Sequence, residues 1–449
     1  MLLELGRLLG AIRYDELPGL TVDKAKDTIL NFLATGLAAA GSPLVSAEKG
    51  VWELAGGCGD CVIIGHSGRV TPIAAASVNA LMGQIYLLED CHEHTLSHPG
   101  VVAIPVALAL GQGANASGKN VVEAVVAGYE AIGRIGTVLI APGFPSFGQR
   151  PASTLAPFGG AAAAALVLGL DGKGISNALA ISANTASGVM EFVNSGADDI
   201  CLQNCFAAKN SVMATMLAAK GIAGSMSILD GQFGLGKAMN RSDLDWSAIV
   251  ADTPGHYQID ESFIKRFPGC GHVLATAQAA TALVAKKKIA PENIESVSLG
   301  VSQRAKDFPG VDNVGPFSGT ISAMMSHQFM VASVFVHGEV SARTVDMYDH
   351  PGVADVAKRI SVELDEEVDR AFPQKTGAKL KMRLKSGEEL SEFVEDISPL
   401  KRDEVIARFR GSADQYFPGS RIDEIIDKTM NIELLGSVNE LMVLLEPGC

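Results

Sequence analysis

The chain has 449 residues, of which 47% are hydrophobic and 19% are charged, and its formal net charge at pH 7 is −14. This balance is typical of a well-packed globular protein and excludes a disordered or fibrous one. The length exceeds the size at which one hydrophobic core keeps growing, so we expect two domains or one domain with an insertion. The negative charge, without a compact run of Lys and Arg, argues against nucleic acid or an anionic lipid surface as a partner.

The cysteines and the apolar segments indicate a cytoplasmic protein. The seven cysteines are odd in number and scattered, which does not make a disulfide framework in a chain of this length and fits a reducing compartment. The N-terminal segment reads as a first helix, because it lacks the long apolar stretch and cleavage site of a secretory signal. The longest apolar runs, 101–110 and 161–170, are too short to cross a bilayer, so we expect no membrane span.

Segments with helical spacing alternate with Gly and Pro breaks from the N-terminus to about residue 225. The spacing predicts helices over 22–40, 72–87, 101–112, 119–141, 155–168, 174–186 and 207–220. Their many Ala and Gly residues let helix axes approach closely, which favours a compact helical core. Between the first two helices, residues 61–72 (CVIIGHSGRVTP) predict a small β-hairpin.

Strand patterns appear after residue 264. Strands are predicted over 294–302, 360–364, 377–384 and 389–394, with helices at 273–286 and 322–337 among them, which makes an α+β unit. From 401 to 445 the spacing is helical again. The predicted fold class is therefore mainly α with an inserted α+β domain. Residues 1–259 and 397–449 would form the helical domain, and residues 260–396 the insertion.

The segment from Glu89 to Gly100 (EDCHEHTLSHPG) crowds acidic residues and three histidines between two apolar helices. A histidine oriented by a nearby carboxylate can titrate near neutral pH, which indicates general acid/base chemistry. Exposed helix caps are one alternative. A metal site is another, but His92 and His94, two positions apart, do not share a helix face and form no HExxH pattern. We therefore predict no metal.

These residues resemble the MmgE/PrpD family, which includes 2-methylcitrate dehydratase, cis-aconitate decarboxylase and iminodisuccinate epimerase. There, a segment Asp-Phe-Asp-Asp-Thr-His, a spacer and His-Pro-Gly open the active site; residues 87–92 (LLEDCH) followed by 98–100 (HPG) are similar. Further similarities follow in the family's order at 149–154 (QRPAST), 207–214 (AAKNSVMA), 265–270 (KRFPGC) and 326–332 (SHQFMVA). The resemblance covers nearly the whole chain. It implies an all-helical domain with an α+β lid, a homodimer, no cofactor and a small polycarboxylate substrate.

The resemblance and the chemistry together assign candidate site residues. His98 would be the base next to a substrate carboxylate, Asp90 its orienting partner or a second acid, and Lys265 a movable positive charge at the carboxylate oxygens. These are the expected catalytic residues. Six further residues are expected to contact the substrate: Arg150, whose guanidinium can grip a carboxylate with parallel donors, and Cys91, His92, Lys209, Arg266 and His272.

Alternatives stay open at three of these positions. Lys209 could be a solvated or ion-paired helix residue, and His272 could pack or cap a helix. Cys91 beside His92 could act as a thiolate nucleophile, although no oxyanion-hole motif is evident.

Five positions depart from the family pattern. Leu87 stands where the family has Asp and Cys91 where it usually has Thr. Arg150 stands where it has His, Ile200 where it has Lys, and Phe329 where Tyr is common. These departures leave three functions open. The first is a cofactor-independent lyase, either a dehydratase or a decarboxylase; the second is an isomerase or epimerase using the same proton abstraction; the third is a non-catalytic member that binds a polycarboxylate.

Two other patterns are weaker. Residues 231–237 (GQFGLGK) fit GxxxxGK, but Ala238 supplies no hydroxyl for Mg²⁺ and no buried strand precedes the loop, so nucleotide binding is not favoured. Cys58 and Cys61 form half of a zinc or iron–sulfur pattern, but a second pair at suitable spacing is missing.

Overall fold

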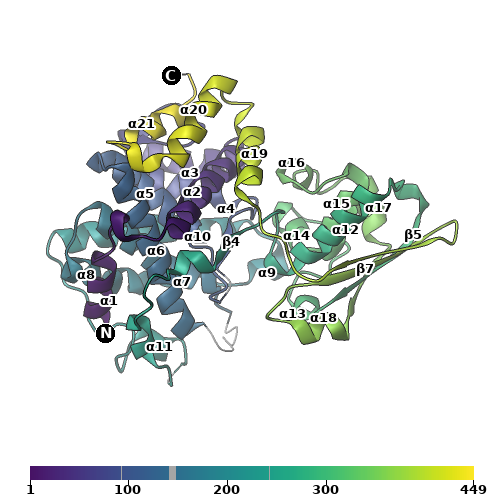
Figure 1. Cartoon of the computed structure of the whole chain (residues 1–449), viewed down its shortest axis with the longest axis horizontal. Helices are drawn as coiled ribbons and strands as arrows, with labels where there is room; N and C mark the ends of the chain where they lie inside the picture. The colour runs from purple at the N-terminus through teal and green to yellow at the C-terminus, as the bar shows by residue number, and fades with distance from the viewer. Residues whose placement is uncertain (93, 141–147, 242, 449) are drawn as a thin grey trace.

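The computed structural model describes residues 1–92, 94–140, 148–241 and 243–448. Over these residues the protein is mainly helical with small β-sheets. Figure 1 shows a helical mass that carries both termini and, beside it, a part that contains β5 and β7 with α12, α15 and α17. The predicted mainly α character with some β structure is confirmed. The division at residues 260 and 396, and the role of the insertion as a lid, stay predictions.

The N-terminal half is a set of helices joined by short loops. They are α1 (Leu2–Gly10), α2 (Gly19–Ala39), α3 (Pro43–Leu54), α4 (Pro72–Gln84), α5 (Gly100–Ala114), α6 (Gly118–Leu139), α7 (Pro151–Val167), α8 (Gly172–Ser182), α9 (Phe192–Ser195), α10 (Asp199–Ala219) and α11 (Leu235–Ala238).

The small hairpin predicted between α3 and α4 is present as β1 (Cys58–Val62) and β2 (Arg69–Val70), which pair antiparallel. The predicted end of α6 at residue 141 lies outside the described residues.

Small residues let these helices pack closely, as the composition predicts. A Cβ on Gly128 of α6 would lie 2.5 Å from the Cβ of Ala103 on α5. A Cβ on Gly160 of α7 would lie 2.4 Å from the Oγ of Ser211 on α10. Both distances are below van der Waals contact, so glycine at these two positions allows the helix axes to approach.

The α+β part is built on a four-stranded sheet of order β6-β5-β7-β8. Its strands are β5 (Ile294–Val301), β6 (Ile360–Leu364), β7 (Ala378–Leu384) and β8 (Glu389–Val394). β5 pairs parallel with β6 and antiparallel with β7, and β7 and β8 form the predicted hairpin. Alternate residues of β7 are buried, which is the pattern of a sheet with one covered face.

The helices of this part are α12 (Leu274–Lys286), α13 (Gln303–Asp307), α14 (Thr320–Met325), α15 (His327–His337), α16 (Ala342–Val345), α17 (Pro351–Ala357) and α18 (Glu366–Ala371). The single helix predicted over 322–337 is two helices. They break at Ser326, which has extended backbone, and its side chain accepts a hydrogen bond from the backbone N–H of Phe329 at 3.0 Å. A hydroxyl that caps a new helix in this way competes with continuation of the previous one.

The chain then returns to the helical mass through α19 (Arg402–Ala413), α20 (Gly419–Met430) and α21 (Asn439–Met442), and α19 packs on α2. No single helix within the described ranges combines the length and apolar character needed to cross a membrane. Only α2 and α3 taken together, bent by 93°, meet that test of length and composition.

The structure predicts that acid destabilises the protein through His327. Its ring is fully buried, and burial lowers its pKa from 6.5 to about 4. Between pH 6.5 and 4 this histidine is protonated in the unfolded chain but neutral in the folded protein. The free energy of unfolding therefore falls as the pH drops towards 4. At pH 5 the loss through this residue should be roughly 2 kcal/mol.

Urea unfolding at pH 7, 6 and 5 measures this loss, and His327→Gln should flatten the pH dependence. Identical slopes for the two proteins would contradict the assignment.

Candidate active site

Two segments far apart in the chain meet in the short sheet formed by β3 (Asp90–His92) and β4 (Ser262–Ile264). The strands pair antiparallel, with Asp90 opposite Ile264. Glu89 immediately precedes β3 and Lys265 immediately follows β4, so the pairing places these two residues side by side. The backbone confirms this, because the N–H of Lys265 donates to the carbonyl of Glu89 at 3.4 Å.

Glu89 joins Lys265 to His98. The Lys265 Nζ lies 2.6 Å from the Glu89 Oε1, and the His98 Nδ1 lies 3.5 Å from the same oxygen. The Lys265 and Glu89 side chains are 1% and 3% exposed, whereas that of His98 is 16% exposed. The structure therefore brings the predicted base and the predicted cation together in a buried cluster, with a carboxylate between them.

The backbone just before β3 also contacts this cluster. Leu87 has a φ of +48°, a conformation that costs a non-glycine residue energy, and its carbonyl accepts a hydrogen bond from the Lys265 Nζ at 3.3 Å. A main-chain oxygen thus contacts Lys265 from the position where the family carries an acidic side chain.

His98 is held as a neutral base. Its Nδ1 lies 2.9 Å from the carbonyl oxygen of Asp90, which only accepts, so Nδ1 carries the proton and Nε2 keeps its lone pair. Burial, and then the positive charges of Lys265 and Arg150, lower the pKa of His98 well below 6.5. The ring is therefore neutral at pH 7 and able to accept a proton at Nε2.

Asp90 acts through its backbone as well as its carboxylate. It is the carbonyl, not the carboxylate, that fixes the ring of His98. The carboxylate Oδ2 accepts from the hydroxyl of Tyr129 at 3.0 Å and from the N–H of Gly100 at 3.3 Å. Burial raises the pKa of this carboxyl to about 6. The orienting role expected for Asp90 is thus found on a different atom, and a role as a second acid stays a prediction.

Arg150 is a buried cation beside the cluster. It precedes α7, is 7% exposed, and donates from Nη1 to the Oγ of Ser153 at 3.3 Å. Its guanidinium carbon lies 5.9 Å from the ring centre of Phe192. Burial lowers its pKa, and the charge of Glu89 acts in the opposite direction. No carboxylate of the described residues lies within 4.0 Å of it, so its charge has no direct counter-ion among them.

Two more predicted residues lie on β3. The Cys91 Sγ is 3.4 Å from the His98 Nδ1, and burial raises the pKa of the thiol to about 12, which disfavours the thiolate that a nucleophile needs. The His92 Nε2 lies 3.2 Å from the Gln258 Oε1, and burial lowers its pKa to about 4. Glu93, the next residue of the motif, lies outside the described part of the chain.

Three predicted contact residues have other partners. Arg266 forms two hydrogen bonds with the carboxylate of Glu404, at 2.5 and 2.9 Å. The Lys209 Nζ lies 4.4 Å from the ring centre of Phe206, and the ring of His272 lies 4.5 Å from that of Phe308. None of these contacts joins the cluster around Glu89, and a role of these residues in substrate binding stays a prediction.

Sequence reasoning missed two residues that the structure places at the site. Glu89 stood inside the acidic motif, but the resemblance drew attention to Asp90. Arg408 of α19 gave no signal at all. Its half-buried guanidinium donates to the carbonyls of Lys265 at 2.8 Å, Arg266 at 2.9 Å and Leu88 at 3.4 Å. Arg408 therefore clamps the two segments that carry Lys265 and Glu89.

Two of the departures are apolar and buried. Ile200 lies in the first turn of α10 and is 3% exposed. Phe329 is fully buried, with its ring edge against that of Phe317. Neither position supplies a charge or a hydroxyl to a ligand. The described residues also contain no group of three or more His, Cys, Asp or Glu side chains arranged to hold a metal ion.

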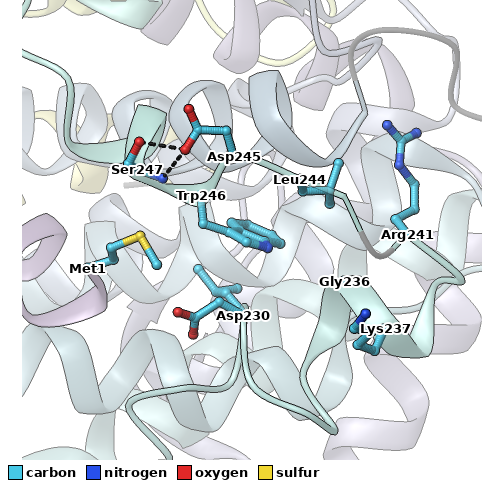
Figure 2. A pocket seen from close by; sticks show the side chains of 10 residues that line it. Met1, Asp230, Gly236, Lys237, Arg241, Leu244, Asp245, Trp246 and Ser247 are labelled. Atoms are coloured by element: carbon cyan, nitrogen blue, oxygen red, sulfur yellow. Dashed lines mark hydrogen bonds between the residues drawn. The ribbon is translucent and has the colours of Figure 1, made fainter.

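The GxxxxGK loop lines a separate pocket of about 390 Å³, with Asp230, Lys237, Arg241 and Trp246 around it (Figure 2). A phosphate-binding loop presents free backbone N–H groups to its ligand. Here the N–H groups of Gly234 and Gly236 donate to carbonyls of the same loop region, at 2.9 and 3.1 Å. These N–H groups already have partners within the loop region. The segment is therefore better described as a tight turn than as a nucleotide-binding loop.

The described residues thus form a mainly helical chain with a buried Lys–Glu–His cluster beside Arg150, which has no carboxylate within 4.0 Å among them. Comparison with known families identifies it further. Residues 4–247 match the MmgE/PrpD N-terminal domain and residues 267–432 match the MmgE/PrpD C-terminal domain. The chain belongs to the MmgE/PrpD family, as the sequence motifs indicated.

Curated relatives are distant but cover most of the chain. A cis-aconitate decarboxylase of Aspergillus terreus is 24% identical over 458 residues, covering 96% of this chain and 93% of that protein. The cis-aconitate decarboxylase of Homo sapiens is 25% identical over 403 residues, covering 84% of this chain and 80% of that protein. The similarity thus extends across both family domains.

The geometry makes a prediction about the titration of His98. Lys265→Met or Arg150→Gln removes one of the two cations that depress the pKa of this ring, so each variant should raise that pKa towards 6.5. Lys209→Met, which removes a cation with partners elsewhere, should leave it unchanged. Nitrogen-15 NMR of the imidazole between pH 4 and 8 measures the shift. A His98 pKa that is the same in all four proteins would contradict the arrangement.

Proposed function

We propose that this protein is a cofactor-independent lyase that removes a proton next to a carboxylate of a small di- or tricarboxylic acid. The observation that carries the proposal is the contact of His98 and Lys265 with one oxygen of Glu89, at 3.5 and 2.6 Å. This contact supports a mechanism in which a neutral base and a cation act on the same small molecule. The names of the relatives, which are decarboxylases, support lyase chemistry on such an acid.

The roles follow from where charge develops. Abstraction of the proton by the His98 Nε2 builds negative charge on a group that is already anionic, so cations at the carboxylate oxygens are required. Arg150 can hold a substrate carboxylate with two parallel N–H donors. Lys265 has three N–H donors, of which Glu89 and the Leu87 carbonyl take two, leaving one for the substrate.

In a dehydration, the electron pair left by the proton forms a carbon–carbon double bond while the C–O bond breaks. The hydroxyl takes back a proton from His98 and leaves as water. In a decarboxylation, the bond to one carboxylate breaks, CO₂ leaves, and the electron pair of that bond stays on carbon, which receives a proton that His98 has taken up from water. We favour dehydration. Epimerisation, with the proton returned to the other face, is the alternative, and carboxylate binding without turnover is a second.

The proposal predicts turnover of a small polycarboxylate that depends on His98 and Lys265. Proton NMR of a mixture of di- and tricarboxylic acids in deuterated buffer reports dehydration, decarboxylation and hydrogen exchange together. Once a substrate is found, His98→Ala should lower kcat by about 10²- to 10⁴-fold, the usual contribution of a general base. Lys265→Met should lower kcat/KM, and Lys119→Met, which removes an exposed lysine paired with Asp15, should leave both unchanged.

Circular dichroism of each variant serves as the control that the fold persists. Full activity of both the His98 and the Lys265 variant would refute the assignment of roles. Exchange of deuterium without loss of water or CO₂ would select epimerisation. Self-association into a homodimer is part of the same proposal, on the basis of the family resemblance, and light scattering of the purified protein tests it.

A further inference from the structure

The donors of the cluster outnumber its acceptors. After its two contacts, the ammonium of Lys265 keeps one N–H. The guanidinium of Arg150 has five N–H groups, and one of them donates to the Ser153 Oγ. Buried donors of charged groups need acceptors. In the proposed function, the carboxylate groups of the substrate supply these acceptors.

One atom of the cluster needs the opposite kind of partner. The Glu89 Oε2 is buried and has no hydrogen-bond partner among the described residues, while Oε1 of the same carboxylate is held by Lys265. An ionised carboxylate oxygen can only accept hydrogen bonds, and leaving it buried without a donor is costly. A ligand made of carboxylates alone brings more acceptors and no donor, so it leaves this atom unsatisfied.

We propose that Glu89 is a specificity-determining residue that accepts a hydrogen bond from a hydroxyl of the substrate. The site then selects hydroxy acids over acids of the same carbon skeleton that lack the hydroxyl. This inference rests on the proposed function, because it assumes that the carboxylates bind at Arg150 and Lys265. It narrows the substrate from any small polycarboxylate to one that carries a donor near the base.

Charge decides between the two common donors of small acids. The Lys265 ammonium already lies 2.6 Å from the Glu89 Oε1. A ligand ammonium at Oε2 would therefore bind the second oxygen of the same carboxylate, close to another positive charge. The charge of Arg150 also acts on this region, since Glu89 and Arg150 influence each other. Three cations around one carboxylate repel one another in a buried site. A hydroxyl donates without this penalty, so we infer a hydroxy acid and not an amino acid.

The test uses pairs of acids that differ in one group. Citrate and tricarballylate both have three carboxylates, and only citrate has a hydroxyl. Succinate has two carboxylates and no further polar group, whereas malate adds a hydroxyl and aspartate an ammonium. Isothermal titration calorimetry should give citrate and malate Kd values about 10- to 100-fold lower than tricarballylate and succinate, the usual effect of a hydrogen bond to a charged group. Aspartate should bind no better than succinate.

Variants assign the preference to Glu89. Glu89→Gln keeps the size of the side chain and removes its charge, so the preference for the hydroxyl should fall to within about threefold. The weaker hold on Lys265 affects both acids of a pair, and the ratio cancels it. Glu404→Gln, which breaks the ion pair of Arg266 next to Lys265 in the chain, should keep the full preference. Glu89→Asp retains the charge and shortens the reach, and should reduce the preference if Glu89→Gln does not fold.

Each result decides the question. Equal binding of the paired acids by the unmodified protein, or a preference that survives in the folded Glu89 variant, overturns the role of Glu89 and leaves the carboxylate site intact. Tighter binding of aspartate than of malate overturns the choice of hydroxyl. Absence of binding by all five acids overturns the proposed function and this inference together.

Discussion

The ion pair between Lys265 and Glu89 is the interaction on which the site depends. Both side chains are almost completely buried, and taking two such charges out of water costs on the order of several kcal/mol for each ion. Their contact at 2.6 Å, with a further bond from Lys265 to the Leu87 carbonyl, offsets this cost only while both partners stay in place. Removing one partner leaves an uncompensated charge in the interior, so a substitution of either residue alone lowers the stability of the protein.

The pair also sets the electrostatics of its surroundings. The charge of Lys265, together with Arg150 and burial, keeps His98 neutral. The negative charge of Glu89 in turn acts on Arg150, whose guanidinium has no carboxylate within 4.0 Å among the described residues. The imidazole of His98 thus lies in one buried region with the ammonium of Lys265, the carboxylate of Glu89 and the influence of the Arg150 charge.

Much of the fold could be predicted from the sequence, because its signals are local. The strands β5 to β8 alternate in hydrophobicity, and their predicted limits agree with the structure within one residue. The start of α10 at Asp199 was missed, since its first two turns carry polar residues that obscure the helical spacing. The break at Ser326 was missed as well, because one hydroxyl decides between a continuous helix and a cap.

The site was predictable only where a motif named the residue. His98 and Lys265 were predicted this way, and the structure brings them together in space, with β3 paired to β4 between their segments. The bond from the Asp90 carbonyl to His98 was not predictable, because a main-chain atom leaves no mark in the sequence. The partner of Arg266 was not predictable either, since Glu404 lies 138 positions further along the chain.

The position of Arg408 in the chain affects the order in which the cluster can form during synthesis. During synthesis the residues of β3 and β4 leave the ribosome well before α19, and until Arg408 emerges its hydrogen bonds to the carbonyls of Leu88, Lys265 and Arg266 cannot form. A nascent chain that already contains His98, Glu89 and Lys265 therefore lacks the clamp that fixes their geometry. The arrangement of these residues in the folded protein is thus completed by one of the last helices to be made.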